Sequence, residues 1–445
     1  MRVDSGIVGR VVRIPAFLIA VSLAAQNTGA PDPDHLLVEI KTKIAAMTRT
    51  LPRYTCTETV ERQYFRGDAR NPIDSCKKDN HLRLDGLDRF RLDVTVANNH
   101  EIFAWAGASR FDSRRVDEIV RQGPTSTGAF GTYLVEIFVR PGAQFQFLQK
   151  QEVDGRPVLE YSFRVPKELS HYGLGLSGHL HMSGYGGTFQ IDPENLQLQR
   201  LDIQTDQLDP GTEMCNVETT LFYQRAAAGD SGFLLPAETK QSILRPNGEV
   251  HNARTTFAAC HEYTAESVIR FGDEPGGGSS QSARNAQQAP LPEGLPVALA
   301  LSEAIRSDTV AAGDAVAAKV LHNVTAQGSR EVLIPSGATV RGRIIDMRLW
   351  LRTYSYFLIS VNWQTVNIGG DVKPFSAKLD RAAESQKARL PGTPHGRGLE
   401  VILPPPGLHP DSTSWLFRMT GKSYTIQKDF PSFWLTTAAS STKME

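Results

Sequence analysis

Three histidines are the first residues whose type and spacing could support chemistry. His179 and His181 are two positions apart, so on a strand both side chains would lie on one face, and His171 is nearby. A pair of this kind can bind zinc or copper. A metal site also needs further ligands at a matching spacing, and none follows. We therefore predict surface histidines and no bound metal.

A glycine-rich segment at residues 173–178, GLGLSG, matches the spacing G-x-G-x-x-G. That pattern binds a dinucleotide only where a strand precedes it and a helix N-terminus follows it. Here Val165-Pro166 precedes it and a glycine-broken strand follows, so the segment predicts a bent hairpin and no cofactor. Ser177 also lacks the frame of a nucleophile elbow, because His179 stands where the second glycine belongs.

Two further groups combine acidic, basic and nucleophilic side chains. Asp192 and Glu194 belong to the run Asp192-Pro193-Glu194-Asn195, which is typical of a turn between two strands within residues 183–207. Cys260 precedes a histidine and a glutamate, but a disulfide would remove its thiol from any reaction. We assign no catalytic residue and predict a protein that is not an enzyme.

Bulk composition narrows the class of protein. The 445 residues suggest two or three domains, and Lys plus Arg and Asp plus Glu both total 48, so no net field points to a nucleic-acid partner. Residues 1–25 combine three arginines, an apolar run and small residues, which predicts a secretory signal peptide. Later segments have no apolar run of about 18 residues, so we expect no transmembrane segment in the mature chain and a periplasmic or extracellular location.

The four cysteines agree with that compartment. An even number in an exported protein favours two disulfides over free thiols, and sequence leaves three pairings open. We expect Cys56 to pair with Cys76 and Cys215 to pair with Cys260, because the residues between each pair could form a hairpin or connect two neighbouring strands.

The periodicity of apolar residues predicts the elements. Residues 32–51 begin with Asp-Pro and repeat apolar positions every three or four residues, which predicts an amphipathic helix of about five turns. From Tyr54 the period becomes two, and Asp154-Gly155 and Asn247-Gly248 are strong hairpin signals. Residues 112–120 and 128–138 are predicted to be helical.

These patterns give a mainly β (α+β) fold in two parts. Residues 32–272 are predicted to form a helix followed by a long antiparallel meander, and residues 273–290, rich in Gly, Ser and Gln, a flexible linker. Residues 291–438 contain short strands and turns typical of a second, small all-β barrel or sandwich, and residues 439–445 form a tail.

Aromatic residues of the first part could line either a packed core or an apolar cavity. A packed core is the default, and patterning does not separate the two. The residues that we expect to contact a ligand in a cavity are Phe90, Phe103, Trp105, Phe163 and Phe189.

The first part resembles the periplasmic lipoprotein-carrier and lipoprotein-sorting proteins of the LolA-like superfamily. The resemblance lies in the helix before the first strand, in Arg89-Phe90-Arg91-Leu92, and above all in GTFQIDP at residues 187–193 followed by LQLQRL at residues 196–201. It implies an incomplete antiparallel barrel, here called a half-barrel, with a helical lid over an apolar cavity for acyl chains. The four cysteines and the extra length near residues 109–140 depart from that pattern.

Two fainter resemblances concern the whole chain and its second part. The start YTCTET at residues 54–59 looks like that of uncharacterised secreted two-domain bacterial proteins. Residues 291–297, 313–316 and 333–342 resemble the β-barrel domain of the TrbI-type conjugation-channel protein. That resemblance implies a β-barrel and an envelope setting.

Three functions follow as hypotheses. The first is an exported, non-enzymatic envelope protein that binds an apolar ligand, with a lipid, a lipoprotein or another envelope protein as partner. The second is a structural or assembly module without a ligand, which a filled sheet face would favour. The third is a secreted hydrolase, for which only His171, His179, His181 and Asp192 offer candidate groups.

Overall fold

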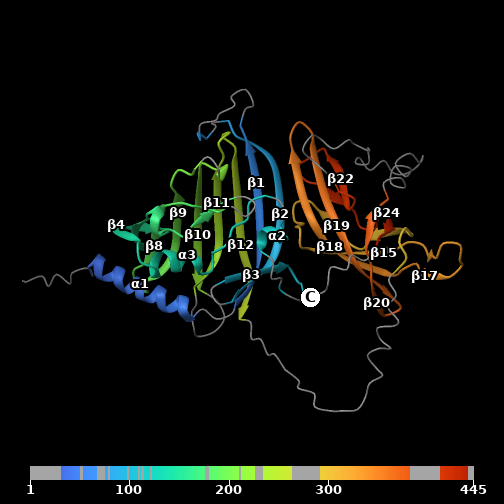
Figure 1. The fold of residues 1–445 in the computed structure, drawn as a ribbon, viewed down its shortest axis with the longest axis horizontal. Helices are drawn as coiled ribbons and strands as arrows, with labels where there is room; N and C mark the ends of the chain where they lie inside the picture. Colours follow the sequence, from blue (N-terminus) through green and yellow to red (C-terminus); the bar gives the residue numbers. More distant parts are fainter. Residues whose placement is uncertain are drawn as a thin grey trace, which may run out of the picture.

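The chain folds into two lobes of mainly antiparallel strands, which lie side by side in Figure 1. The structure, a computed structural model, describes residues 32–50, 54–67, 76–78, 81–97, 100–108, 111, 115–120, 123–175, 180–209, 212–225, 234–262, 291–380 and 411–438. The predicted signal peptide, the linker at residues 273–290 and the tail at residues 439–445 lie outside these ranges, so those three expectations stay predictions.

The first lobe contains the helices and twelve of the described strands. Its helical segments are α1 (Pro33–Thr50), α2 (Val116–Ile119), α3 (Thr132–Leu134), the π-helix η1 (Val135–Val139) and the 3₁₀ helix η2 (Lys167–Leu169). Its strands are β1 (Tyr54–Arg66), β2 (Arg83–Ala97), β3 (His100–Trp105), β4 (Gln144–Val153), β5 (Arg156–Val165), β6 (Gly173–Leu174), β7 (His181–Met182), β8 (Tyr185–Asp192), β9 (Gln197–Thr205), β10 (Asn216–Arg225), β11 (Leu234–Leu244) and β12 (Val250–Glu262).

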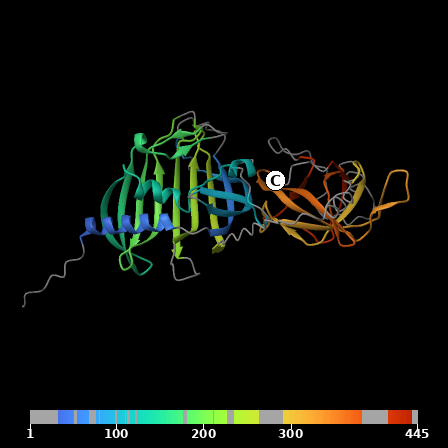
Figure 2. The same cartoon turned by 60° about the horizontal axis from the view of Figure 1, so that its bottom comes forward.

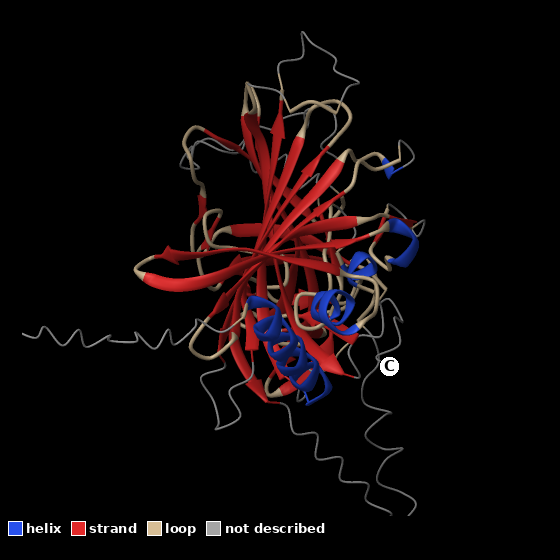
Figure 3. Cartoon of the chain, turned by 90° about the vertical axis from the view of Figure 1, so that its left-hand side faces the viewer, coloured by secondary structure: helices blue, strands red, loops and turns tan. Residues whose placement is uncertain are grey.

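Ten of these strands form one open sheet in the order β4-β5-β8-β9-β10-β11-β12-β1-β2-β3. Helices α1 to α3 lie on one side of it, as Figure 3 shows, and α1 runs across the strands near the β4 edge in Figure 2. We call this side the helix face. The mainly β half-barrel with an N-terminal amphipathic helix, expected from the sequence, is therefore confirmed. The helices predicted at residues 112–120 and 128–138 are present but shorter.

The hairpin of β8 and β9 forms as its local sequence predicts. The Asp192 carboxylate accepts hydrogen bonds from the Glu194 backbone N–H at 2.8 Å and from the Asn195 side chain at 2.9 Å, which fixes the turn. Gly187 allows the close approach expected of this stretch, because a Cβ atom there would lie 1.9 Å from the Asp202 carbonyl oxygen. The bent hairpin predicted around residues 173–178 is also present, as the short pair β6 and β7.

The disulfides join other partners than we expected. Cys56 pairs with Cys260, and Cys76 pairs with Cys215. The predicted pairs were wrong because β1 has two partner strands. It pairs with β2 along one edge and with β12, distant in the sequence, along the other. That pairing places Thr55 opposite His261 and brings the neighbouring cysteines together.

The second lobe consists of short strands wrapped around its own core. Their pairings run in a ring through β13, β15, β18, β19, β20 with β21, and β24 back to β13. Trp363, Trp415 and Trp434 pack edge to face in the centre of this core. The strands are β13 (Pro296–Leu301), β14 (Ile305–Arg306), β15 (Ala315–Val320), β16 (Val324–Thr325), β17 (Val332–Ile334), β18 (Thr339–Leu351), β19 (Ser355–Ile368), β20 (Asp371–Pro374), β21 (Ala377–Leu379), β22 (Ser414–Met419), β23 (Thr425–Ile426) and β24 (Pro431–Thr436).

Backbone hydrogen bonds join the two lobes into a continuous sheet. Strand β18 pairs antiparallel with the first half of β2, where residues 348–350 face residues 86–88. Gly313 makes a second contact possible, since a Cβ atom there would lie 2.3 Å from the Arg91 carbonyl oxygen and its φ is +102°. The second lobe thus covers the part of the β2 edge that does not pair with β3.

Candidate functional site

Helix α1 covers an aromatic wall near the β4 edge of the first lobe. On α1 the side chains of Ile40 and Ile44 are 0% and 3% exposed. They share one buried cluster with η1, against which α1 lies, and with residues of β5, β8 and β9. Phe189 of β8 lies at the centre of this wall, with ring centroids of Tyr161 and Phe138 at 5.2 and 5.0 Å. The wall is filled by side chains in this conformation. We call the aromatic and apolar side chains that lie beneath α1 the covered wall.

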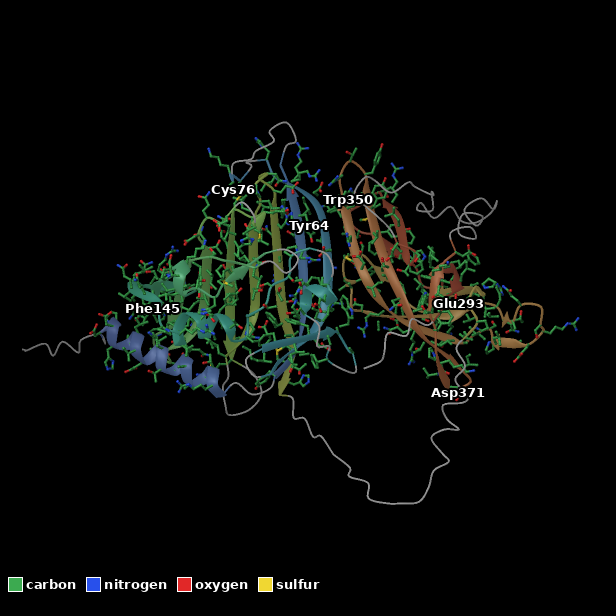
Figure 4. All side chains as sticks on the ribbon, in the orientation of Figure 1. Tyr64, Cys76, Phe145, Glu293, Trp350 and Asp371 are labelled. Carbon is green, nitrogen blue, oxygen red and sulfur yellow. A yellow bond between two sulfur atoms is a disulfide. The ribbon has the colours of Figure 1, made fainter. Side chains whose placement is uncertain are left out.

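Two hydrogen bonds and one cation–π contact attach α1 to residues of the described strands and turns. The Tyr161 hydroxyl donates to the Pro33 carbonyl oxygen at 3.0 Å, and the Lys43 ammonium donates to the Asn195 carbonyl oxygen. Lys41 lies over the ring of Phe145, 5.0 Å from its centroid, beside α1 in Figure 4. The apolar side chains of α1 therefore provide most of its attachment.

The aromatic residues predicted to contact a ligand fall into two separate clusters. Phe163 and Phe189 lie in the covered wall, with ring centroids 6.5 Å apart. Phe90 and Phe103 are buried beneath α2, and Trp105 is half-buried beside them. The structure thus brings together two of the five at the wall and three elsewhere, and their role in binding stays a prediction.

A small cavity with polar lining groups borders the cluster of Phe90 and Phe103. Glu58 of β1 and Glu101 of β3 line a cavity of about 30 Å³, together with hydroxyl groups that include those of Thr239 and Thr255. The Glu101 carboxylate accepts hydrogen bonds from the backbone N–H groups of Gly128 at 2.7 Å and Phe130 at 3.0 Å. Burial raises the pKa of Glu101.

The carboxylate of Glu58, unlike that of Glu101, is buried without hydrogen-bond donors among the described residues. Its side chain is 6% exposed, and no residue in the described part of the chain donates a hydrogen bond to it. Burial, and secondly the negative charge of Glu101, raise its pKa well above the usual value. The strand pattern carries a signal for this position that sequence reasoning missed, because Glu58 interrupts the apolar alternation of Tyr54, Cys56 and Val60.

A larger cavity, of about 280 Å³, lies where the two lobes meet. Its apolar lining comes from β1 and β2 of the first lobe and from β18 of the second. Figure 4 labels Tyr64 on β1 and Trp350 on β18, the two strands that pair with opposite edges of β2. Tyr64 packs edge to face on His251 of β12, with ring centroids 4.9 Å apart. We call this space the inter-lobe cavity. Sequence reasoning missed it, because its lining residues are far apart in the chain.

Charged residues around the inter-lobe cavity are paired with one another. Arg62 forms two hydrogen bonds to Asp88, at 2.6 and 2.9 Å, and Tyr64 donates a third to the same carboxylate at 2.7 Å. Arg66 lies 3.2 Å from Glu249. Burial, and secondly the charge of Arg245, lower the pKa of His251 to about 4, so its imidazole is neutral at physiological pH.

The groups first considered for chemistry do not gather into a site. His171 lies 3.2 Å from Glu136, His181 belongs to the short strand β7, and Asp192 holds the turn after β8. His179 lies outside the described residues, and Cys260 is held in a disulfide. Among the described residues no group of three or more His, Cys, Asp or Glu could hold a metal ion.

A membrane-spanning helix is not found either. Within the described ranges, no helix has both the length and the apolar character needed to cross a bilayer.

Comparison with known proteins gives distant structural likenesses only. No protein-family model matches the chain, and no curated protein matches its sequence. A putative outer membrane lipoprotein-sorting protein domain from Vibrio parahaemolyticus is 11% identical, with a TM-score of 0.26, covering 51% of this chain and 92% of that one. A LolA superfamily protein from Nitrosomonas europaea is 9% identical, with a TM-score of 0.23, covering 52% and 94%.

A DUF1329 family protein from Desulfovibrio piger is 9% identical, with a TM-score of 0.27, covering 54% of this chain and 98% of that chain. The first two structures carry the class names that the sequence resemblance of residues 34–271 had suggested.

Proposed function

We propose that the protein binds an apolar ligand, either a lipid or the acyl chain of a lipidated protein, at the covered wall after α1 moves away. The observation that carries this proposal is the attachment of α1 at one edge of an open sheet, with its apolar side chains packed over an aromatic cluster. Because the wall is filled, the ligand must replace the side chains of α1. Binding and opening are therefore one coupled step.

The energies are compatible with this exchange. Fully burying one Ile side chain stabilises by about 1.5–3 kcal/mol, so removing Ile40 and Ile44 from the wall costs on the order of 3–6 kcal/mol. Each buried CH₂ group contributes about 0.8 kcal/mol, so an acyl chain of about 14 carbons offers roughly 11 kcal/mol. Leu36, Leu37 and Met47 of α1 also pack on this cluster, so the cost of opening and the gain from the acyl chain are of the same order of magnitude.

The proposal includes export to the periplasm or the cell exterior. Two disulfides lie among the described residues, and such bonds persist in oxidising compartments. The signal-peptide pattern of residues 1–25 supports the same location. We also propose that the second lobe contacts another envelope component.

A structural module without ligand is the second candidate. The burial of the wall favours it, because Phe189 at its centre is 0% exposed. The two candidates differ in one respect: only the first requires α1 to open.

Binding of a dansylated fatty acid to the full mature chain separates the two candidates. Ile44→Ser weakens the closed state, so we expect it to increase the apparent affinity for the probe by about 10-fold or more. Val38→Ser is the matched control on the same helix, since Val38 is 64% exposed, and we expect no change.

A second control excludes nonspecific binding to a loosened core. Val361→Ser destabilises the core of the second lobe and should leave probe binding unchanged. No probe binding by either wild type or Ile44→Ser would favour the structural module, and equal binding by both would show that the ligand does not replace α1 at the covered wall. Mass spectrometry of the exported protein then distinguishes co-purified free lipid from a lipidated protein.

A further inference from the structure

The inter-lobe cavity has the size of a small-molecule site and lies at a junction, where such sites are often found. Its volume of about 280 Å³ is nearly twice that of an apolar cavity known to hold one benzene ring, about 150 Å³. A flat molecule with roughly two fused rings matches this volume. Three aromatic side chains, Tyr64, Phe65 and Trp350, line the space and could contact its ring faces.

The ionic groups around the cavity exclude a charged ligand as the best match. Asp85 is held by Arg352, with hydrogen bonds of 2.8 and 2.9 Å, and Arg348 lies 2.7 Å from Asp346. With Arg62 on Asp88 and Arg66 on Glu249, every charged side chain that lines the cavity has an opposite charge beside it. A charged ligand would lose its hydration without gaining a free counter-charge.

One uncharged polar group of the lining still needs a hydrogen-bond partner. The neutral imidazole of His251 receives and donates no hydrogen bond within the described part of the chain. A neutral imidazole has one N–H donor, so it can bind an acceptor on the ligand. The Trp350 indole N–H also lacks a partner among the described residues, but its nitrogen is buried, so Trp350 offers the ligand only its ring.

We propose that the inter-lobe cavity binds an uncharged, flat molecule of roughly two fused rings that carries a hydrogen-bond acceptor. The ligand contacts β1, β2 and β12 of the first lobe and β18 of the second. Its binding therefore also stabilises the contact between the lobes. This site is separate from the covered wall, and neither proposal depends on the other.

The test uses 7-methoxycoumarin, which is uncharged, bicyclic and fluorescent, with the full mature chain. We expect saturable binding with a Kd on the order of tens of micromolar, as is reasonable for a ligand of this size. Coumarin-3-carboxylate is the charged counterpart, and we expect it to bind at least ten-fold more weakly. The methoxycoumarin should also raise the Tm of the protein.

Variants locate the binding. Trp350→Leu removes one aromatic wall of the cavity, so it should weaken binding of 7-methoxycoumarin by ten-fold or more. Tyr354→Leu is the matched control, because Tyr354 is 55% exposed on the β18–β19 hairpin and does not line the cavity; its Kd should equal that of wild type.

His251→Leu decides the result if Trp350→Leu does not fold, since it keeps an apolar wall and removes only the imidazole. We expect a weakening of three-fold or more. Absence of saturable binding up to 1 mM probe, equal binding of the charged coumarin, or an unchanged Kd in the folded cavity variants would each overturn the proposal.

Discussion

Arg352 of the second lobe and Asp85 of the first form a forked ion pair, in which Nε and Nη2 of the guanidinium donate to the two carboxylate oxygens at 2.8 and 2.9 Å. The pair is partly shielded from solvent, with side-chain exposures of 32% and 18%. It stands beside the short β2–β18 pairing that joins the lobes.

We predict that this ion pair couples the lobes energetically. A double-mutant cycle of Arg352→Gln and Asp85→Asn should give a coupling free energy of about 1–2 kcal/mol in urea unfolding, above the usual value for fully exposed pairs because the contact is forked and partly buried. Arg306→Gln, which breaks the exposed pair with Asp308, should leave the unfolding curve unchanged. A coupling of zero would show that this ion pair does not help to hold the lobes together.

The disulfide from Cys56 to Cys260 is predicted to contribute strongly to stability. It closes a loop with a sequence separation of 204 residues, for which the chain-entropy relation gives about 5 kcal/mol and measured losses run to about 2–5 kcal/mol. Replacing both cysteines by serine should lower the free energy of unfolding by that amount. Peptide mapping without reduction should show Cys76 joined to Cys215 in the wild type and in this variant, and a Cys56–Cys76 peptide would contradict the pairing.

Local signals in the sequence explain which parts of the fold were predictable. The turn at Asp192 and the two-residue turn at Asp154-Gly155 depend on side chains and φ angles within a few residues, so the sequence predicts both hairpins. The pairing of β1 with β12 depends on how a ten-stranded sheet curves, which no local pattern states. The disulfide partners were wrong for that reason.

The candidate sites were less predictable than the fold, for a related reason. Strand alternation tells which face a residue occupies but not its distance from another residue across the sheet. Phe90 and Phe189 share the helix face, yet seven strands of the sheet order, from β8 to β2, place them in separate clusters. Tyr64 and Trp350 meet only because β18 adds to the edge of β2, a contact between distant parts of the chain.

Glu58 is predicted to destabilise the protein as pH rises. The folded-state pKa is raised by burial and by Glu101, whereas the unfolded value is about 4.3. The unfolded chain therefore releases its proton at lower pH, and stability falls above about pH 4.3, by about 1.4 kcal/mol per pH unit, until the folded pKa is reached. Glu58→Gln removes this loss, so its advantage over wild type should grow between pH 5 and pH 7.

The measurement is the free energy of urea unfolding at each pH for both proteins. Glu218→Gln is the matched control, because Glu218 is exposed and has no described ion-pair partner, and its difference from wild type should not change with pH. A pH-independent difference for Glu58→Gln would show that water or a bound group in the cavity stabilises the ionised carboxylate.

His251 should give the opposite pH dependence. Burial lowers its folded-state pKa to about 4, compared with about 6.5 in the unfolded chain. Between these values the unfolded chain binds the proton more readily, so stability is lost as pH falls from 6.5 towards 4. His251→Leu removes the titration, and wild type should lose up to about 2 kcal/mol relative to it over this window, a figure reduced to allow for the solvent access of the ring.

Unfolding at pH 7, 6, 5 and 4.5 checks this dependence, with His322→Leu as the control because His322 is exposed. The control should follow wild type at every pH. If wild type and His251→Leu keep a constant difference, the imidazole is as well hydrated in the folded protein as in the unfolded chain. The inter-lobe cavity would then be open to water at His251. The pKa of His251 would not be lowered, and burial would not hold its imidazole as a neutral hydrogen-bonding group.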